Sequence, residues 1–224
     1  MLYEGMNINI TLLFSIDSYE TVARTYISAL ERRLAEDKPV RQVASVASFF
    51  LSRIDVLVDQ LLQHRIRPAH SPGYDPRPAE LLGQVAVANA KLAYQSFKAL
   101  FGEPRWKALA QAGARVQRPL WASTSVKNPD YPDVQYVEPL IGPHTVNTMP
   151  EETIAAFADH GVATENSVEA DLDEARRILR DLESVGISLA HVTWQIQHEG
   201  VQKFIDPFDK LADTLAHKCN QLSP

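Results

Sequence analysis

A lysine follows a short apolar run in the middle of the chain. The run reads Arg118-Pro-Leu-Trp-Ala-Ser-Thr-Ser-Val-Lys127, in which apolar residues give way to a polar turn. A strand that ends in such a turn presents its last side chains where parallel barrels build their sites. Three roles are open to Lys127. It is an imine-forming nucleophile if it is desolvated, a phosphate clamp if it is accessible, or a solvated loop lysine.

An arginine ends an earlier apolar segment. Arg53 follows Ala44-Ser-Val-Ala-Ser-Phe-Phe-Leu-Ser, and its guanidinium is a permanently charged fork suited to bidentate phosphate binding. The competing interpretation is an ion pair with Asp55 or Asp59, but neither spacing places a carboxylate on one helical face with Arg53. We therefore predict that Arg53 binds phosphate. Ser123 either adds a hydroxyl to the same phosphate or is an ordinary turn residue.

Two pairs of residues have the two-residue spacing that places side chains on one face of a strand. They are Asn9 with Thr11, and Ser48 with Phe50. Polar side chains that point into a core need hydrogen-bond partners or a ligand. Asn9 and Thr11 therefore either bond to neighbouring strands or face a substrate, and Phe50 is either core packing or a pocket wall.

The elements that must position these residues alternate between strands and helices. Apolar runs predict four strands, and apolar residues at helical spacing predict a helix after each of the first two. The segment 64–78, rich in Pro, His, Arg and Gly, is predicted to be a surface loop. The predicted strands are 8–14, 42–51, 118–123 and 144–148, and the later predicted helices are 78–100, 106–111, one that opens at 149–152, 171–184, 189–204 and 207–220.

Strands that alternate with helices predict an α/β fold with a parallel sheet and right-handed crossovers. A doubly wound sheet is disfavoured because no Gly-rich turn follows the first strand. A closed TIM barrel requires eight strand-helix units and roughly 250 residues, whereas this chain of 224 residues shows half that number of units. We therefore predict a single domain, residues 1–224, that forms an incomplete half barrel with extra C-terminal helices.

Composition restricts the partners. The formal net charge is −6 without any basic run, which argues against nucleic acid or an anionic membrane and is compatible with a phosphorylated small molecule. No apolar stretch is long enough for a membrane span, and no signal-peptide pattern opens the chain. Cys219 is the single cysteine, so no disulfide within the chain is expected and a cytoplasmic location is predicted.

No metal or cofactor is predicted. The histidines lack the i, i+4 pairing with a nearby acid that is typical of a metal site, and His144 is followed by a threonine. The histidines are His64, His70, His144, His160, His191, His198 and His217.

Four blocks of the sequence resemble, in order and spacing, successive blocks of the transaldolase family. The tail is similar to the closing helices of the family, so the resemblance covers essentially the whole chain. The blocks are Gly5-Met-Asn-Ile-Asn-Ile-Thr-Leu-Leu-Phe-Ser15, Ala44-Ser-Val-Ala-Ser-Phe-Phe-Leu-Ser-Arg-Ile-Asp55, Trp121-Ala-Ser-Thr-Ser-Val-Lys-Asn-Pro129 and Val146-Asn-Thr-Met-Pro150, and the tail is Glu199-Gly-Val-Gln-Lys-Phe204 with Phe208-Asp-Lys-Leu211.

The resemblance implies a barrel transferase of the pentose phosphate pathway. Such an enzyme moves a dihydroxyacetone group between sugar phosphates, sedoheptulose 7-phosphate and glyceraldehyde 3-phosphate, through a Schiff base on a lysine. In the family that lysine lies on the fourth barrel strand, and the acid/base carboxylates lie on the first and third. A Glu-Gly-x-Asn-x-Asn motif, which begins here at Glu4 and overlaps the first block, resembles the family segment immediately after the fourth strand. The resemblance therefore implies that this chain contains barrel strands five to eight and that it contains none of the catalytic residues of the family.

The same resemblance implies a set of substrate-binding residues. Ser48 would lie near the reacting carbonyl, and Phe50 would shape the pocket. Phe50 stands where small aldolase relatives have Tyr, which favours group transfer over aldol cleavage. A phosphate-binding arginine of the family falls near Lys127, where a short insertion offsets the two sequences. The implied set is Asn9, Thr11, Ser48, Phe50, Arg53, Ser123 and Lys127, with Asn9 and Thr11 positioning substrate or water.

The positions of the lysines agree with a chain that lacks the Schiff-base lysine of the family. Only Lys127 follows a strand at its carboxyl end, where barrel sites are built. Its neighbours are mostly polar, which favours a clamp or a solvated lysine over a nucleophile. The other lysines are expected on surface helices or linkers; they are Lys38, Lys91, Lys98, Lys107, Lys203, Lys210 and Lys218.

We expect the chain by itself to have little or no transaldolase activity. Its expected partners are sugar phosphates, together with a missing N-terminal half or a second copy that pairs with the open sheet edges at 8–14 and 146–149. The alternative function is a non-catalytic half barrel that binds sugar phosphates or serves in assembly.

Overall fold

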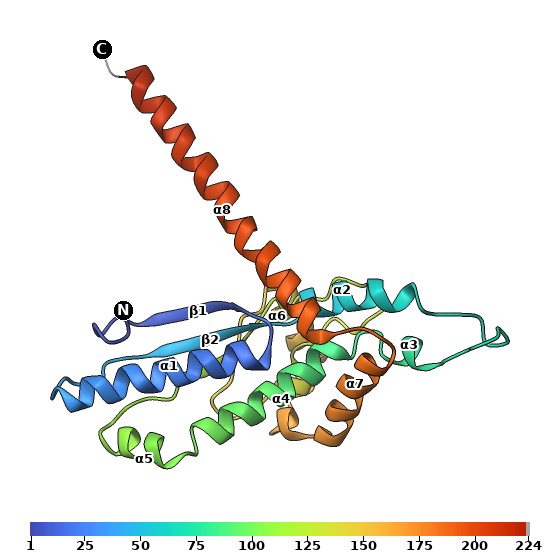
Figure 1. Cartoon of the computed structure of the whole chain (residues 1–224), viewed down its shortest axis with the longest axis horizontal. Helices are drawn as coiled ribbons and strands as arrows, with labels where there is room; N and C mark the ends of the chain where they lie inside the picture. Colours follow the sequence, from blue (N-terminus) through green and yellow to red (C-terminus); the bar gives the residue numbers. More distant parts are fainter. Residues whose placement is uncertain (223–224) are drawn as a thin grey trace.

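A computed structural model describes residues 1–222; the side chains of residues 219–222, including that of Cys219, lie outside its description. The chain has an α/β fold around one sheet of four strands in the order β1-β2-β3-β4 (Figure 1). Every neighbouring pair of strands is parallel, as predicted. The strands are β1 (Ile8–Leu13), β2 (Ser45–Phe50), β3 (Arg118–Ala122) and β4 (Val146–Asn147). Strand β4 is shorter than predicted because His144 has a left-handed φ of 62°, which is not an extended conformation.

Helices cover one face of the sheet, and the core lies between the two layers (Figure 1). Alternate residues of the strands point into this core. Phe49 of β2 and Trp121 of β3 meet there edge to face, with ring centroids 6.2 Å apart. The helices of this layer are α1 (Ile16–Ala35), α4 (Val85–Leu100), α5 (Pro104–Gln111) and α7 (Leu172–Ser184); the remaining helical elements are α2 (Ser52–Gln63), α3 (Arg77–Glu80), α6 (Glu151–His160), α8 (Leu189–Leu222) and the 3-10 turns η1 (Glu138–Leu140) and η2 (Ser167–Glu169).

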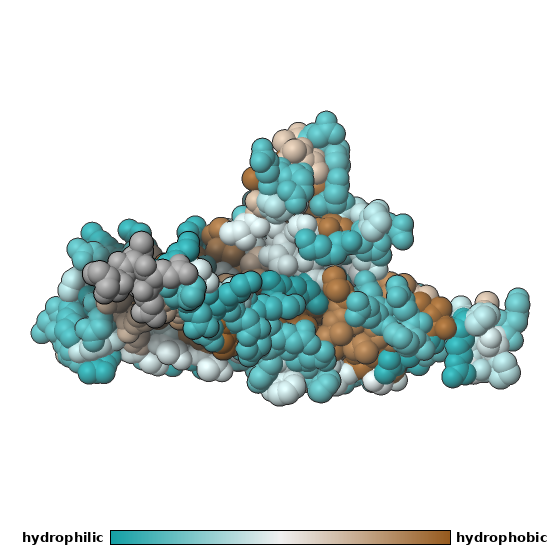
Figure 2. Space-filling view, turned by 90° about the horizontal axis from the view of Figure 1, so that it is seen from above, coloured by the Kyte–Doolittle hydropathy of each residue, from teal (hydrophilic) through white to brown (hydrophobic). Residues whose placement is uncertain are grey.

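Two helix predictions are wrong. The predicted helix 78–100 is divided into α3 and α4, because the chain turns at Gly83 with a φ of 69°. The predicted helices 189–204 and 207–220 form one helix, α8, with Pro207 inside it. Proline removes one helical hydrogen bond, and an exposed helix has room for its ring. Helix α8 projects from the body (Figure 1), on a side whose surface is mostly hydrophilic with separate apolar patches (Figure 2).

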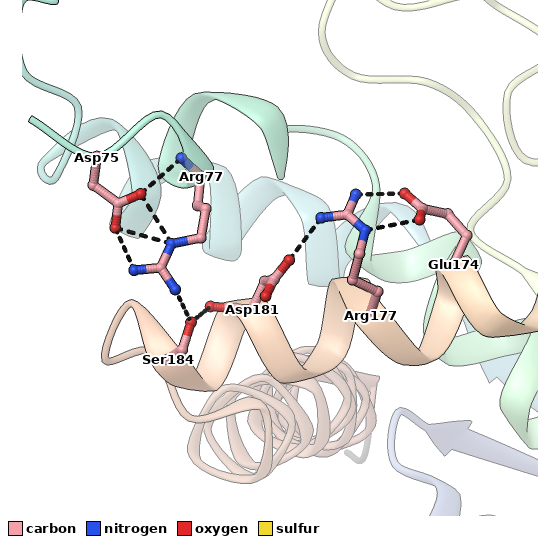
Figure 3. Close-up of polar contacts among 6 residues, drawn as sticks. All are labelled: Asp75, Arg77, Glu174, Arg177, Asp181 and Ser184. Atoms are coloured by element: carbon pink, nitrogen blue, oxygen red, sulfur yellow. Dashed lines mark hydrogen bonds and ion pairs between the residues drawn. The ribbon is translucent and has the colours of Figure 1, made fainter.

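A chain of polar contacts holds the end of the predicted 64–78 loop against α7 (Figure 3). Arg77 forms an ion pair with Asp75 at 2.7 Å and donates a hydrogen bond to Ser184 Oγ at 2.8 Å. Asp75 and Arg77 are partly exposed, so the contacts orient the segment and contribute little to stability. The residues of the chain are Asp75, Arg77, Glu174, Arg177, Asp181 and Ser184.

A buried carboxylate ties α2 to the segment that follows β3. Asp55 accepts hydrogen bonds from the Ala86 N–H and from the Tyr136 hydroxyl, both at 2.8 Å. Burial nevertheless raises the pKa of Asp55 to about 7, because a desolvated carboxylate favours its neutral form. This part of the fold therefore contains a group that titrates near neutral pH.

A second carboxylate repeats the arrangement one helical turn later. Asp59 accepts hydrogen bonds from the Gly83 N–H at 2.9 Å and from the Tyr131 hydroxyl at 2.8 Å. Burial raises the pKa of Asp59 as well. The turn at Gly83 thus serves two purposes, since it separates α3 from α4 and supplies a donor to α2.

Among the residues that the structure describes, no helix is both long enough and apolar enough to cross a membrane.

Replacing Gly83 with alanine should lower the free energy of unfolding more than replacing Gly186. Both glycines have positive φ, and a side chain there costs about 1–2 kcal/mol. A Cβ on Gly83 would also lie 2.7 Å from the Tyr131 ring, whereas nothing lies within 4 Å of one on Gly186. Urea unfolding of the two variants measures the difference. Equal losses would contradict the close packing of Tyr131 on this turn.

Asp55→Asn should change how stability depends on pH. The pKa of Asp55 rises from an ordinary 3.8 to about 7 on folding, so the folded state binds more protons in that interval. Its contribution to the free energy of unfolding therefore falls as pH rises from about 4 to about 7. The asparagine variant cannot titrate, so its stability relative to the parent should increase across this interval. Urea unfolding at several pH values tests this, and a difference independent of pH would contradict it.

Candidate functional site

The site is built where β2 and β3 end side by side. Parallel pairing continues past both strands, since the Leu51 N–H donates to the Ala122 carbonyl at 3.0 Å and the Ser52 N–H to the Ser123 carbonyl at 3.1 Å. The hydroxyls of Ser52 and Ser123 lie 2.9 Å apart. Ser123 has a φ of 55°, a left-handed conformation that turns the chain away from the sheet. The first turn of α2 and the turn after β3 therefore lie next to each other.

A pocket of about 540 Å³ opens at this edge, and we call it the Arg53 pocket. It brings together Arg53, Ser123 and Lys127, three residues that the sequence singles out. Helix α8 closes one side of it. The polar residues of its lining are Ser52, Arg53, Gln60, Ser123, Lys127, Gln195, Glu199 and Lys203.

The charges of the Arg53 pocket favour an anion. Three cationic side chains, Arg53, Lys127 and Lys203, line it together with one carboxylate, that of Glu199. Arg53 also lies in the first turn of α2, whose N-terminus carries partial positive charge. The N-cap residue Leu51 offers no side-chain cap, and the Ser52 and Ile54 amides of the first turn already donate to the Ser123 and Leu51 carbonyls. An anion bound here would meet permanent charge and the positive end of the helix dipole together.

Arg53 is available for a ligand. The competing interpretation, an ion pair with Asp55 or Asp59, is wrong, because both carboxylates accept hydrogen bonds from tyrosine hydroxyls and backbone amides instead. The guanidinium carbon of Arg53 lies 5.2 Å from the centroid of the Phe50 ring. Such a contact orients an arginine without using its hydrogen-bond donors.

Lys127 is exposed, and its Nζ donates to Ser125 Oγ at 2.9 Å. An imine-forming lysine needs a desolvated or cation-flanked pocket. An exposed amine with a hydroxyl partner instead has the properties of a mobile point charge. The geometry favours the clamp over the nucleophile.

The other four predicted residues lie on the sheet, outside the lining of the Arg53 pocket. Asn9 and Thr11 are exposed, contrary to a placement inside a covered core. Ser48 is buried and donates to Asn9 Oδ1 at 2.7 Å, which is bonding between neighbouring strands. Phe50 is half-buried, with its ring centroid 5.3 Å from that of Phe14.

One lysine, Lys203, lies on an exposed helix as predicted but joins the Arg53 pocket, and another, Lys91, is buried, contrary to the prediction. Lys203 lines the Arg53 pocket, and no local signal in the sequence indicates this because it approaches only through the path of α8. Lys91 is buried in α4, where its Nζ donates to the Ala170 carbonyl at 2.8 Å. Burial lowers the pKa of Lys91. Lys91 lies away from the strand ends, and it is not a candidate for the site.

No group of three or more His, Cys, Asp or Glu residues in the described part of the chain is arranged to hold a metal ion.

Comparison with known proteins gives these residues a context. A family model described as Transaldolase/Fructose-6-phosphate aldolase matches residues 1–215. The chain is 45% identical to Transaldolase of Trichodesmium erythraeum (strain IMS101), over 99% of this chain and 58% of that protein. It is 46% identical to Transaldolase 2 of Nostoc sp. (strain PCC 7120), with 99% and 58% covered. It is 42% identical to Transaldolase of Mycobacterium ulcerans (strain Agy99), with 100% and 58% covered.

The chain thus spans less than two thirds of the length of these curated relatives. The match to the family nevertheless extends over nearly all of the chain, and it includes every residue of the Arg53 pocket. The chain belongs to the transaldolase/fructose-6-phosphate aldolase family.

Proposed function

We propose that this chain carries the phosphate-binding part of a transaldolase, an enzyme that transfers a dihydroxyacetone group from sedoheptulose 7-phosphate to glyceraldehyde 3-phosphate in the pentose phosphate pathway. The single observation that carries the proposal is the Arg53 pocket in a member of this family. Three cations, two hydroxyls and a helix N-terminus converge there on a chain whose net charge is −6. Local positive charge on an acidic protein favours an anionic substrate.

The proposed binding mode follows from the chemistry of the lining. Arg53 takes two phosphate oxygens with its planar fork, and the Ser52 and Ser123 hydroxyls donate to the same group. Lys127 and Lys203 add point charges that need no fixed geometry. The sugar then extends over the exposed face of the sheet, with Phe50 as a wall and Asn9 and Thr11 as polar contacts. The buried Ser48 orients Asn9 through its hydrogen bond.

The covalent step requires groups from outside this chain in our proposal. Lys127 is the lysine nearest the pocket on a strand end, and its exposure argues against an imine. Strands β1 and β4 each have one strand neighbour, so each offers a free edge for a complementary half barrel. A Schiff-base lysine and acid/base carboxylates on such a half would complete the enzyme. A second copy of this chain could cover the edges, but it could not supply that lysine.

The second candidate function is a non-catalytic half barrel that binds sugar phosphates or serves in assembly. The same free edges favour it, because unpaired parallel strands invite pairing with another chain. Both functions use the Arg53 pocket, but only the first includes catalytic turnover.

Arg53→Ala should weaken binding of glycerol 3-phosphate, a simple phosphate monoester, by about tenfold or more, since hydrogen bonds to charged groups contribute about 1.5–3 kcal/mol. Arg53→Lys should give an intermediate affinity because lysine keeps the charge and loses the fork. Isothermal titration calorimetry measures both. Arg176→Ala, on the exposed surface of α7, is the matched control. Equal affinity in the Arg53→Ala and Arg176→Ala variants would refute the proposed pocket.

Borohydride reduction in the presence of sedoheptulose 7-phosphate should trap no adduct on this chain alone. The physical reason is that Lys127, its strand-end lysine, is exposed and bonded to the Ser125 hydroxyl, and so lacks the desolvated or cation-flanked pocket that an imine-forming lysine needs. Intact mass spectrometry reads the outcome, with a full-length transaldolase as the positive control. An adduct on Lys127, or turnover by the homogeneous chain in a coupled assay, would contradict the proposal. Binding without turnover, even with added complementary half, would favour the second function.

A further inference from the structure

The two main cations of the Arg53 pocket stand on separate segments. Arg53 belongs to α2, and Lys127 belongs to the segment after β3. Within the described residues, Lys127 donates to Ser125 of its own segment, and Arg53 lies over the Phe50 ring. Neither contact joins the two cations or sets their separation. The Ser52–Ser123 bonds join the two segments at their start, so the spacing of the cations also depends on what holds α2 against the segment after β3 farther along.

Two carboxylate–tyrosine pairs, in which both carboxylates are buried, hold these segments together. Asp55, a carboxylate of one pair, comes two residues after Arg53. Tyr131, the tyrosine of the other pair, comes four residues after Lys127. Each hydroxyl donates to its carboxylate at 2.8 Å. A second pocket, of about 430 Å³, runs along the same contact and shares Lys127 with the Arg53 pocket. The pairs are Asp55–Tyr136 and Asp59–Tyr131.

The chemistry of the two pairs is better suited to fixing the orientation of the two segments than to joining them alone. An apolar pair would join the segments without desolvating a carboxylate, and such a replacement is often stabilising. A hydrogen bond adds direction, because its strength falls steeply when donor and acceptor are misaligned. The backbone donors Ala86 and Gly83 already satisfy one oxygen of each carboxylate. The other oxygen of each is therefore free to hold the tyrosine in one orientation.

We propose that Asp55–Tyr136 and Asp59–Tyr131 are positioning pairs that fix the distance between Arg53 and Lys127, and thereby the affinity of the Arg53 pocket for a phosphate monoester. This inference rests on the proposed function of that pocket. Neither tyrosine lines the pocket, so each acts through the backbone that leads to Lys127. Tyr131 is the closer of the two in the chain and has the larger effect.

The test replaces each tyrosine with phenylalanine, which removes the hydroxyl and keeps the ring. Tyr131→Phe should weaken glycerol 3-phosphate binding by about three- to tenfold, a range typical of residues that act on a site without touching its ligand. Tyr136→Phe should act in the same direction. The matched control is Tyr94→Phe, which loses a buried hydroxyl that donates to the Pro143 carbonyl at 3.0 Å, away from the pocket. It should lower the melting temperature and leave the affinity unchanged.

A double mutant separates positioning from a general loss of stability. In a Lys127→Ala background, Tyr131→Phe should cause no further loss of affinity, because the group that it positions has been removed. An equal loss in both backgrounds would overturn the role of Lys127. An equal loss in Tyr94→Phe would overturn positioning altogether.

The outcomes also distinguish this inference from the proposed function. If Arg53→Ala weakens binding and both Tyr→Phe variants leave it unchanged, the pocket stands and the positioning pairs are wrong. If the unaltered protein does not bind glycerol 3-phosphate, the proposed function fails, and amide hydrogen exchange then decides the positioning claim. Faster exchange across residues 124–130 in Tyr131→Phe than in Tyr94→Phe supports positioning. Equal exchange overturns it.

Discussion

Parallel backbone pairing between β2 and β3 continues beyond the ends of both strands, and the site depends on it. The bond from the Ser52 N–H to the Ser123 carbonyl, 3.1 Å long, places the first turn of α2 against the turn after β3. Parallel strands send their carboxyl ends to one edge of a sheet, so residues far apart in sequence meet there. Arg53 and Lys127 share a pocket for this reason.

The contact between α2 and the segment after β3 also contains several buried polar groups. Most of the core is apolar, yet Asp55 and Asp59 of α2 are buried with tyrosine and backbone donors. Satisfied networks of this kind favour one arrangement of the segments over others, because a shifted register would leave a carboxylate without partners. The desolvated carboxylates lower the free energy of unfolding, but their hydrogen bonds give a defined geometry next to the Arg53 pocket.

The chain matches only part of its longer relatives, and its sheet is open at both edges. The relatives named Transaldolase are longer than this chain, which covers 58% of them. The sheet ends at β1 and β4 within the described residues, and Asn9 and Thr11 are exposed on its uncovered face. Polar residues on such a face are suited to contact with water or with the ligand of our proposal. An apolar face left uncovered would instead favour aggregation.

The sequence by itself determined the alternation of strands with helices, the parallel sheet and the family, and it favoured an Arg53 without an ion pair to Asp55 or Asp59. These follow from local periodicity, spacing and motifs, which depend on residues close together in the chain. The tertiary structure alone decided that Lys203 joins the Arg53 pocket, that Lys91 is buried, and that Asp55 and Asp59 meet Tyr136 and Tyr131. It also decided that a helix ends before Gly83 while α8 continues through Pro207. The placements of Lys203, Lys91, Asp55 and Asp59 depend on solvent exclusion or on contacts between distant segments, and no local pattern indicates either.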